Sequence, residues 1–414
     1  MADAAPASLL RERPFVQFWG ARFLTTVALH MQAVAVGWQM YDLTGNPLDL
    51  GLVGLVQFLP SLLLVLVAGH FADRHDRRRI ISLAQAAAGL ASALLTIGTA
   101  AGLLTREWIL ATVFVVGMGR AFEAPTVAAL LPALVPSALL PRAVAASSAA
   151  GQIGMIGGPA VGGFLYAVSP VLVYALCCVL FLIGSTLMFL LRAAPLPPAR
   201  EPITPERLFA GIAFIRGNPI VLGAIMLDLF AVLLGGAVAL LPIFARDILA
   251  TGPWGLGVLR AAPAVGALIV SAALTQFSPR QRVGQVIFAA VAAYGAATLA
   301  FALSHSLILS TAALVVVGAS DMISVVARHT LIQLHTPDAM RGRVSAVNLM
   351  CVFASNQIGD FRAGLVAAWL GAVPAVLIGG VGTLAVVVAC RRIFPELARV
   401  DRFERRESGA VETA

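Results

Sequence analysis

The sequence contains no lysine, and all 28 of its basic residues are arginine. This absence excludes a P-loop nucleotide site, because the lysine of that motif must reach the β- and γ-phosphates. Charge of either sign is also scarce, at 12% of the 414 residues, against about 25% in soluble domains. Since a soluble fold of this length needs roughly twice as many charged residues, the composition excludes cytosolic enzymes and nucleic-acid-binding proteins.

Motifs that hold a metal or a nucleophile are missing as well. No histidine starts the helical zinc-protease motif, and no nucleophile elbow is visible. The four cysteines lie inside apolar runs, without the paired spacing of a zinc site or a loop position for a disulfide. We therefore predict that the protein is not an enzyme and that it holds no metal and no cofactor.

Apolar residues, by contrast, make up 60% of the chain, and the mean hydropathy is +0.93. A helix that crosses a membrane needs about 20 mainly apolar residues. Twelve windows of this kind are present, at residues 15–40, 48–72, 80–103, 108–131, 143–168, 171–191, 220–245, 255–277, 284–303, 307–331, 344–370 and 373–393. We therefore predict an all-α integral membrane protein with twelve transmembrane helices in a lipid bilayer.

Arginines are distributed unevenly over the segments between these windows. With the N-terminus inside, 21 arginines fall in cytoplasmic segments or at the cytoplasmic end of the last window (Arg391 and Arg392), two (Arg106 and Arg246) fall on the opposite side, and five lie deeper within windows. Positive charge collects on the cytoplasmic side of membrane proteins. The distribution therefore predicts that both termini are cytoplasmic, and the net charge of +8 needs no nucleic-acid partner.

A proline-rich segment separates the sixth window from the seventh, and its prolines prevent a continuous helix. Apolar residues at helical spacing then predict a short helix in the inner membrane interface, at Leu208, Phe209, Ile212 and Ile215. We divide the chain into an N-terminal six-helix bundle (1–192), a cytoplasmic linker with this short helix (193–219), a C-terminal six-helix bundle (220–394) and a cytoplasmic tail (395–414).

The two bundles match each other at a constant offset of 201 residues. The matching pairs are Pro136 with Pro337, Arg142 with Arg343, Gly158 with Gly359, and Gly163 with Gly364. Four pairs on one offset, with six windows in each half, indicate a duplication. Duplicated helical bundles that move around a site at mid-membrane are the architecture of secondary transporters. We therefore expect two six-helix bundles related by a pseudo-two-fold axis.

The segment between the second and third windows resembles a known motif. Five of its residues fit the G-x-x-x-D-R-x-G-R-R loop of the major facilitator superfamily: Gly69, Asp73, Arg74, Arg77 and Arg78. Asp76 replaces the usual inner glycine, and because aspartate tolerates a left-handed backbone we expect the turn to persist. The resemblance implies a gating loop in which Asp73, near a helix N-terminus, and the arginines hold one conformation. The alternative is an arginine cluster that only sets the topology.

The fifth window carries a second motif. Its residues match the G-x-x-x-G-P-x-x-G-G antiporter motif of exporters in that superfamily: Gly154, Gly158, Pro159, Gly162 and Gly163. Glycines four residues apart make one smooth helix face, and the proline permits a bend. The resemblance implies export, and the alternative is ordinary tight packing. Over nearly its whole length the chain resembles the enterobactin-exporter-like, transmembrane secretion effector group of the superfamily, for example at Ala21, Arg22, Phe23, Gln333, Thr336 and Pro337.

Charged residues inside the windows indicate a cavity. Each costs about 2.5 to 3.5 kcal/mol at the centre of a lipid-facing helix, so they cannot all face lipid. We select six as candidates for proton coupling or a substrate cavity: Arg120, Glu123, Asp228, Arg260, Asp321 and Asp360. Three further arginines are expected to extend toward the membrane surface, namely Arg22, Arg328 and Arg362.

Two of the candidates are related by the internal repeat. Asp321 lies at the position equivalent to Arg120, and Glu123 lies one turn after Arg120 on the same helix face. We predict that these three residues form a proton-coupling cluster across the cavity, and the superfamily resemblance links Arg120 to proton transfer. A static charge pair that joins the halves is the alternative. Arg260 is expected to contact the substrate, and it suits an anionic or catechol-bearing solute.

Together these features predict a monomeric transporter of a bacterial inner membrane. It is expected to export a small organic solute, siderophore or drug-like, in exchange for protons by alternating access. Its partners are then a small-molecule substrate, protons and the lipid bilayer. An importer, or a lipid or lysolipid translocator on the same fold, stays open as an alternative. A scaffold or sensor that transports nothing is a further alternative, although it has no need for opposed charges at equivalent depths.

Overall fold

The computed structural model describes residue 9 and residues 12–192, 205–276 and 281–401, and the regular structure in this part of the chain is helical throughout. The N-terminal half consists of α1 (Arg13–Thr44), α2 (Pro47–Arg74), α3 (Arg77–Ala100), α4 (Arg106–Leu130), α5 (Leu140–Val168) and α6 (Pro170–Phe189). The C-terminal half consists of α7 (Pro205–Gly217), α8 (Pro219–Gly235), η4 (Val238–Leu240), α9 (Leu241–Ile243), η5 (Phe244–Ile248), α10 (Gly252–Gln276), α11 (Val283–Ala302), α12 (Leu307–Leu334), α13 (Asp338–Leu370), α14 (Ala372–Ile393) and α15 (Pro395–Ala398). The all-α prediction is confirmed.

Within the described residues, nine helical stretches are long and apolar enough to cross a membrane. Three other helices, α1, α5 and α13, are 32, 29 and 33 residues long but carry more glycine and polar side chains. These three helices contact the opposite half: α5 packs against α10, α13 packs against α2, and α1 packs against α9 and α10. A helix that faces a protein neighbour or a cavity needs less apolar surface than one that faces lipid. The twelve predicted windows are consistent with these elements.

The helices begin and end where the sequence supplies local signals. The side chains of Asn46 and Thr105 accept hydrogen bonds from backbone N–H groups in the first turns of α2 and α4, at 3.0 and 3.3 Å. Proline occupies the start of several helices, as at Pro47 and Pro170, where it lacks only an N–H that would have no partner. Gly45, with φ of +60°, ends α1 and lets α2 turn back directly.

The seventh predicted window is not one continuous helix. Residues 220–245 were expected to form a single span, but α8 ends at Gly235 and the chain continues through the short elements η4, α9 and η5. Two adjacent glycines, Gly235 and Gly236, weaken the helix, and Pro242 removes a further backbone hydrogen bond. Arg362 of α13 donates to the carbonyl oxygens of Leu233 (3.0 Å) and Leu234, which the break leaves without helical partners.

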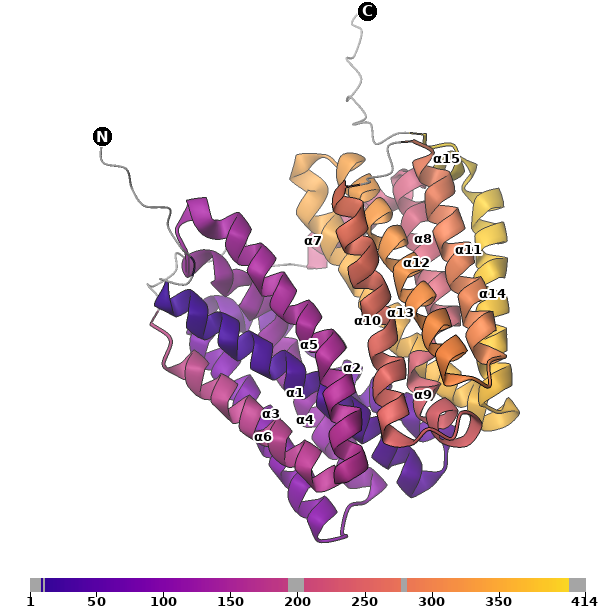
Figure 1. Cartoon of the computed structure of the whole chain (residues 1–414). Coiled ribbons are helices and arrows are strands. Elements are labelled where there is room, and N and C mark those ends of the chain that lie inside the picture. The colour runs from indigo at the N-terminus through magenta and orange to yellow at the C-terminus, as the bar shows by residue number, and fades with distance from the viewer. Residues whose placement is uncertain (1–8, 10–11, 193–204, 277–280, 402–414) are drawn as a thin grey trace, which may run out of the picture.

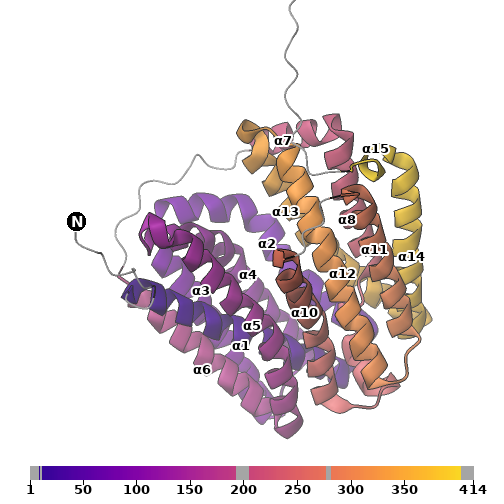
Figure 2. The same ribbon diagram turned by 45° about the horizontal axis from the view of Figure 1, so that its top comes forward.

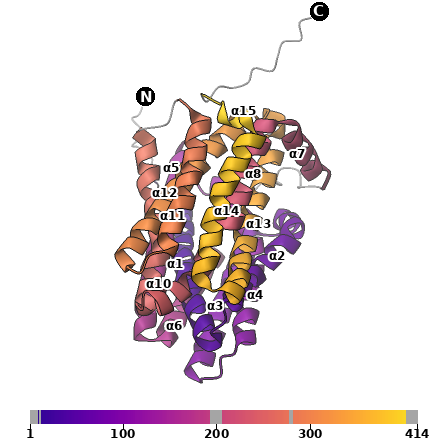
Figure 3. The same cartoon turned by 90° about the vertical axis from the view of Figure 1, so that its right-hand side faces the viewer.

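The two halves lie side by side and lean apart toward one end (Figure 1). We call the end where α1 begins and α14 ends the terminal end, and the opposite end the far end. Contacts between the halves run along α5 with α10 and α2 with α13. α11 and α14 lie on the outer side of the C-terminal half, away from this contact (Figure 3). These four helices, α2, α5, α10 and α13, therefore line the contact between the halves.

Buried apolar residues also join the halves at one end of the molecule and lie in separate clusters toward the other end. At the far end one cluster contains residues of both halves, including Met31 and Met40 of α1, Phe244 of η5 and Phe301 of α11. Toward the terminal end the clusters are separate: one belongs to the C-terminal half around Val221 and two belong to the N-terminal half. The halves are thus joined by a common apolar core at the far end only.

Two glycine crossings bring the halves together near the far end. A Cβ added at Gly163 of α5 would lie 2.8 Å from Cα of Gly257 in α10. A Cβ added at Gly364 of α13 would lie 2.9 Å from Cα of Gly51 in α2. Only glycine permits so close an approach of two backbones. Because Gly163 and Gly364 are a pair of the internal repeat, the two crossings are equivalent, as the duplication requires.

Short elements cover the terminal end of the C-terminal half. Helix α7, in the region expected to form an interfacial helix, packs against α8 and α13 (Figure 2). Part of the predicted tail also packs here, since the side chain of Asp401 accepts from the backbone N–H of Arg282 at 3.1 Å, next to the start of α11. The backbone carbonyl of Val400 accepts from Gly284 at 2.9 Å. Residues 395–401 therefore belong to the C-terminal half.

Candidate transport pathway

Three adjoining cavities lie in the interior of the bundle. A central cavity of about 140 Å³ lies between the halves, an N-half cavity of about 270 Å³ lies among α1, α3, α4 and α6, and a C-half cavity of about 360 Å³ lies among α8, α10, α11, α12 and α13. Leu29 and Val116 line both the central and the N-half cavity, and Val238 lines both the central and the C-half cavity. The cavities are therefore neighbours and cross the contact between the halves.

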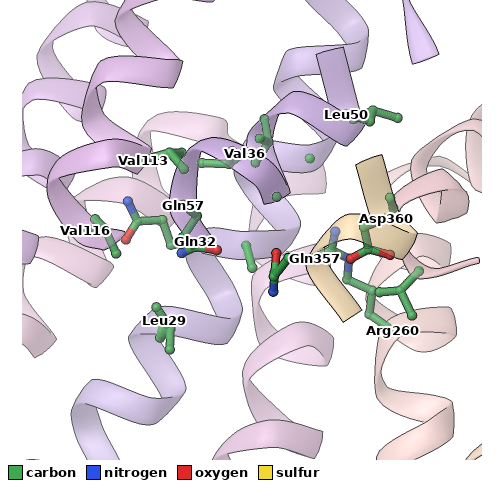
Figure 4. A pocket seen from close by; sticks show the side chains of 16 residues that line it. Leu29, Gln32, Val36, Leu50, Gln57, Val113, Val116, Arg260, Gln357 and Asp360 are labelled. Carbon is green, nitrogen blue, oxygen red and sulfur yellow. The ribbon is translucent and has the colours of Figure 1, made fainter. Parts of the chain in front are cut away.

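The central cavity combines valine side chains with amides and one pair of opposite charges. Gln32, Gln57 and Gln357 line it together with Arg260 of α10 and Asp360 of α13. The side chains of Arg260 and Asp360 lie next to each other, facing the glutamines of the N-terminal half (Figure 4). Nε of Arg260 is buried and has no hydrogen-bond partner. This cavity offers hydrogen-bond donors and acceptors from both halves to a ligand.

The N-half cavity holds Arg22, His30, Arg120 and Glu123. The amide nitrogen of Gln85 donates to the carboxylate of Glu123 at 2.8 Å. Arg120 is exposed to the cavity and makes no hydrogen bond or ion pair within the described residues, and Nε of Arg22 is buried without a partner. Two guanidinium groups in this cavity thus lack a protein partner.

The C-half cavity contains a closed ion pair and a separate carboxylate. Arg328 donates to Asp228 at 2.7 Å and to Ser324 at 3.1 Å, with only 4% of Arg328 and 7% of Asp228 exposed. Asp321 lines the same cavity beside Tyr294, and in the described part of the chain it accepts no hydrogen bond. The expectation that Arg328 extends toward the membrane surface is wrong, because Asp228 gives it a partner in the interior.

The predicted cluster of Arg120, Glu123 and Asp321 is divided between cavities. Arg120 and Glu123 lie in the N-half cavity, whereas Asp321 lies in the C-half cavity with Asp228. Positions related by a pseudo-two-fold axis occupy equivalent places in the two halves, and here these places lie within each half instead of facing each other. Arg362 also differs from expectation, since it caps the broken end of α8.

In the described part of the loop between α2 and α3, Asp76 is the carboxylate that makes hydrogen bonds. Asp73 and Arg74 lie in the last turn of α2, at a helix C-terminus, so the expected position of Asp73 near a helix N-terminus is wrong. The side chains of residues 65–70 and 72–74 lie outside what the structure describes, and these stretches include Gly69, Asp73 and Arg74. Asp76 caps α3 with a φ of −62°, so no left-handed turn is present at this position.

Arg77 and Arg78 connect this loop to two other helices. Arg78 donates to both carboxylate oxygens of Asp76, at 3.0 and 2.6 Å, and to the carbonyl of Leu191 after α6 at 2.7 Å. Arg77 donates to the carbonyl of Ala129 in α4 at 3.2 Å. The hydrogen bonds from Arg78 hold the pKa of the Asp76 carboxyl below its usual value. The loop therefore holds the terminal ends of α3, α4 and α6 together within one half.

The glycines of the fifth window face two different helices. Cβ atoms added at Gly154, Gly158 and Gly162 would each lie 2.8 Å from an atom of α1, and Gly163 faces α10 of the other half. Pro159 lies inside α5, and its carbonyl oxygen would lie 2.6 Å from a Cβ added at Gly257 of α10. The predicted smooth face thus packs inside the N-terminal half, and its last glycine lies at the contact between the halves.

Ion pairs join the halves at the far end. The hydroxyl of Tyr41 donates to Asp247 at 2.5 Å, and Arg246 pairs with Asp42 at 3.0 Å. Tyr41 and Asp42 belong to the last turn of α1, and Arg246 and Asp247 belong to η5. The Arg246 side chain also donates to the backbone carbonyl of Tyr41 at 3.4 Å, so these contacts between α1 and η5 join the halves at the far end.

Comparison with known proteins identifies the family. The sequence matches the family described as transmembrane secretion effector over residues 4–409. The chain belongs to the transmembrane secretion effector family, within the major facilitator superfamily. This secretion effector is 28% identical over 388 residues to Enterobactin exporter EntS of Shigella dysenteriae serotype 1 (strain Sd197), covering 92% of this chain and 88% of that relative. The EntS protein of Escherichia coli O1:K1 / APEC is equally similar, with the same coverage.

Solved structures share the fold of this secretion effector. The crystal structure of nucleoside transporter NupG has a TM-score of 0.73 at 14% identity and covers 92% of this chain and 99% of that chain. An inward-facing bacterial homologue of the iron transporter ferroportin has a TM-score of 0.71 at 17% identity, covering 95% and 100%. The predictions of the superfamily, of the group and of a membrane transporter without enzymatic activity are confirmed.

Several residues of the secretion effector's pathway were missed in the sequence. Gln32, Gln57 and Gln357 line the central cavity, and uncharged amides inside apolar windows were their signal. The far-end residues Tyr41, Asp42 and Asp247 were missed too, although Arg246 was one of only two arginines on that side. Gly51 and Gly257, which contact Gly364 and Gly163 at the two crossings, were missed as well. Their signal in the sequence is a proline four residues before each glycine, Pro47 in α2 and Pro253 in α10.

Proposed function

We propose that this secretion effector exports a small organic solute across a bacterial inner membrane by alternating access, in exchange for protons. The observation that supports this most directly is the set of three adjoining cavities with ionisable side chains, between halves that share an apolar core at one end only. The span-five glycine motif and the relationship to EntS, which is named as an exporter, support the direction.

The arrangement of the halves corresponds to one state of the cycle. If the terminal end is cytoplasmic, as the arginine distribution predicts, the halves are closed toward the outside. The opposite state then requires separation at the glycine crossings and loss of the Tyr41–Asp247 and Asp42–Arg246 contacts. Movement of one bundle against the other around a central site is the usual behaviour of duplicated transporters.

Asp321 is our candidate for the group that exchanges protons. Asp228 is bound by Arg328, and Glu123 accepts from Gln85, so protonation of either carboxylate would disrupt a formed interaction. Asp321 lines the same cavity as the Asp228–Arg328 pair and has no hydrogen-bond partner within the described residues. A carboxylate of this kind inside a membrane protein marks a proton pathway more often than a structural contact. Asp360, next to Arg260 in the central cavity, is the second candidate.

The proposal is tested in everted membrane vesicles, in which export appears as accumulation. A panel of catechol siderophores, macrolides and cationic dyes is screened in a host without its own exporters, and the compounds that accumulate are then measured with and without an inside-acid pH gradient. We expect gradient-dependent accumulation that Asp321→Asn abolishes. Asp338→Asn, a matched change at the exposed terminal end of α13, is expected to leave it intact.

Each alternative outcome contradicts one part of the proposal. Accumulation that ignores the pH gradient in the unchanged protein removes proton coupling. Full gradient dependence in the Asp321→Asn variant removes Asp321 as the coupling group. Gradient-driven uptake into right-side-out vesicles reverses the direction and makes the protein an importer.

A further inference from the structure

Five arginines lie away from the ends of the membrane-spanning helices, and they differ in whether the protein supplies a partner. Arg328 is paired with Asp228, and Arg362 is bonded to the carbonyls at the end of α8. The guanidinium groups of Arg22, Arg120 and Arg260 make no hydrogen bond or ion pair in the described part of the chain, although Asp360 lies next to Arg260, and all three line cavities. A guanidinium in the membrane interior is costly unless a partner or water reaches it. The three unpaired arginines therefore lie where a partner from outside the protein is favoured.

The three arginines line two neighbouring cavities. Arg22 and Arg120 line the N-half cavity, Arg260 lines the central cavity, and the two cavities share Leu29 and Val116 as walls. His30 of α1 lines the N-half cavity together with Arg22 and Arg120. Arg22 lies toward the terminal end of α1, and Gly37 lies toward the far end of the same helix. A Cβ added at Gly37 would lie 3.2 Å from the Arg260 side chain, so Arg260 is closer to the far end than Arg22 is.

The charge in these two cavities favours an anion, whereas the charge of the C-half cavity does not. Three arginines in the N-half and central cavities face two carboxylates, Glu123 and Asp360, and Glu123 is already hydrogen-bonded by Gln85. In the C-half cavity two carboxylates face one arginine. The two halves thus differ in sign, although their helices are related by the repeat. Oxyanions bind guanidinium groups more strongly than neutral ligands do, because the hydrogen bonds are charge-assisted.

The walls of the N-half cavity indicate what else the ligand carries. Phe18, Val127, Phe181 and Met188 surround the terminal-end part of the cavity, next to Arg22. Aromatic and thioether side chains provide an adaptable apolar surface for a ring or chain. The organic part of a ligand would meet only the inner surface of this wall, because 1% of Phe18, 1% of Met188 and 4% of Phe181 are exposed.

We propose that the N-half and central cavities together bind an organic anion with an apolar body, through Arg22, Arg120 and Arg260. The binding role rests on the proposed function, since it names the chemical class of the solute that the transporter carries. The anionic group is held by Arg120 and Arg260 from the two neighbouring cavities, and the apolar body lies against Phe18, Phe181 and Met188. Arg22, at the terminal end of the cavity, attracts the anion as it enters.

The test measures binding to the purified full-length protein in lipid nanodiscs, without any gradient. Three probes share one ring system and differ in charge: 1-naphthoate, 1-naphthalenemethanol and 1-naphthylmethylammonium. We expect 1-naphthoate to bind about tenfold more tightly than either of the others, as one charge-assisted hydrogen bond allows. Arg120→Gln and Arg260→Gln are each expected to remove this preference, and Arg120→Lys to restore part of it.

Arg142→Gln serves as the matched control, because Arg142 is exposed at the start of α5 and lines none of the three cavities. Thermal unfolding of each variant separates loss of binding from loss of folding. Equal affinity for the three probes, undetectable binding of 1-naphthoate, or an unchanged preference in both glutamine variants overturns the proposal. A preserved anion preference together with gradient-independent vesicle transport would instead contradict the proton coupling and leave the anion site intact.

Discussion

At the scale of single residues, one residue type has two different roles inside the same bundle. Arg328 and Arg362 hold the fold together through Asp228 and the end of α8, and Arg22, Arg120 and Arg260 face open space. Composition and hydropathy do not distinguish these roles, because all five lie in apolar windows. The difference lies in partners from other helices, which a residue's own neighbours in the sequence do not reveal.

The buried pair Arg328–Asp228 leads to a prediction on stability. Arg328→Gln leaves the Asp228 carboxylate buried without its cation, and breaking a buried pair in this way costs about 3 to 5 kcal/mol. We expect a clear loss of thermal stability in detergent. The double variant Asp228→Asn with Arg328→Gln removes both charges and is expected to recover part of the loss. If the single variant unfolds at the same temperature as the unchanged protein, the pair is not structural.

The cap at Asp76 leads to a prediction on pH. Because the folded protein lowers the pKa of Asp76, the cap stabilises the protein above the ordinary carboxyl range, and this contribution is lost as the pH falls. Asp76→Ala is expected to cost about 1 kcal/mol at neutral pH and progressively less as the pH falls below the ordinary carboxyl range through the lowered pKa of Asp76. Hydrogen exchange of the first turn of α3, compared between variant and unchanged protein at each pH, measures the difference. A difference that persists in acid argues against the cap.

At the scale of elements, α5 shows how one helix serves two neighbours. Gly154, Gly158 and Gly162 pack on α1 within the N-terminal half, and Gly163 meets Gly257 of α10 across the contact between the halves. The smooth face was predictable from the four-residue spacing. The choice of neighbours was not, because spacing along one helix does not specify which other helix packs against it.

Two glycines of α5 provide a matched pair of substitutions. A Cβ at Gly163 would lie 2.6 Å from the carbonyl oxygen of Pro253, whereas a Cβ at Gly151 would meet nothing within 4 Å. We expect Gly163→Ala to destabilise the protein by about 1 to 3 kcal/mol through overpacking. Gly151→Ala is expected to be neutral or to stabilise by about 0.5 to 1 kcal/mol, since alanine favours the helix. Thermal unfolding in detergent compares them, and equal effects would show that the crossing is loose.

The seventh window shows where the sequence is least informative about an element. Its apolar length predicted one helix, and Gly235, Gly236 and Pro242 were visible inside it. Single glycines and prolines occur in many intact membrane helices, so they do not by themselves predict a break. What allows the break here is Arg362, which supplies donors to the freed carbonyls from a helix far along the chain.

At the scale of the whole molecule, the duplication was predictable and the conformation was not. The offset of 201 residues identified equivalent positions, and the Gly163 and Gly364 crossings follow it. Whether two equivalent halves are open at one end or the other depends on which contacts between them are formed at a given moment. No pattern along a single chain records that.

The far-end ion pairs lead to a prediction on the balance between conformations. Arg246→Ala removes the pair with Asp42 that joins the halves, whereas Arg106→Ala removes a pair with Asp49 inside one half. A partly exposed ion pair contributes about 0.2 to 1 kcal/mol, so we expect the first variant to shift the ratio of the two states by up to about fivefold. The second variant is the control and is expected to shift nothing.

Spin labels at Arg142→Cys and Arg343→Cys, near the terminal ends of α5 and α13, report this balance. Their distance distribution is expected to gain a shorter component in the Arg246→Ala variant, because the terminal end closes when the far end opens. An unchanged distribution would mean that the pair does not hold the far end closed.

The apolar core shared at the far end has a consequence for temperature. Opening that end uncovers part of the buried surface around residues such as Phe244 and Phe301, and newly hydrated apolar surface raises the heat capacity. Burial of such surface is favoured less strongly in the cold. For the proposed alternating-access cycle we therefore expect cooling to shift the population toward molecules open on the far side, so that temperature acts alongside the ligands.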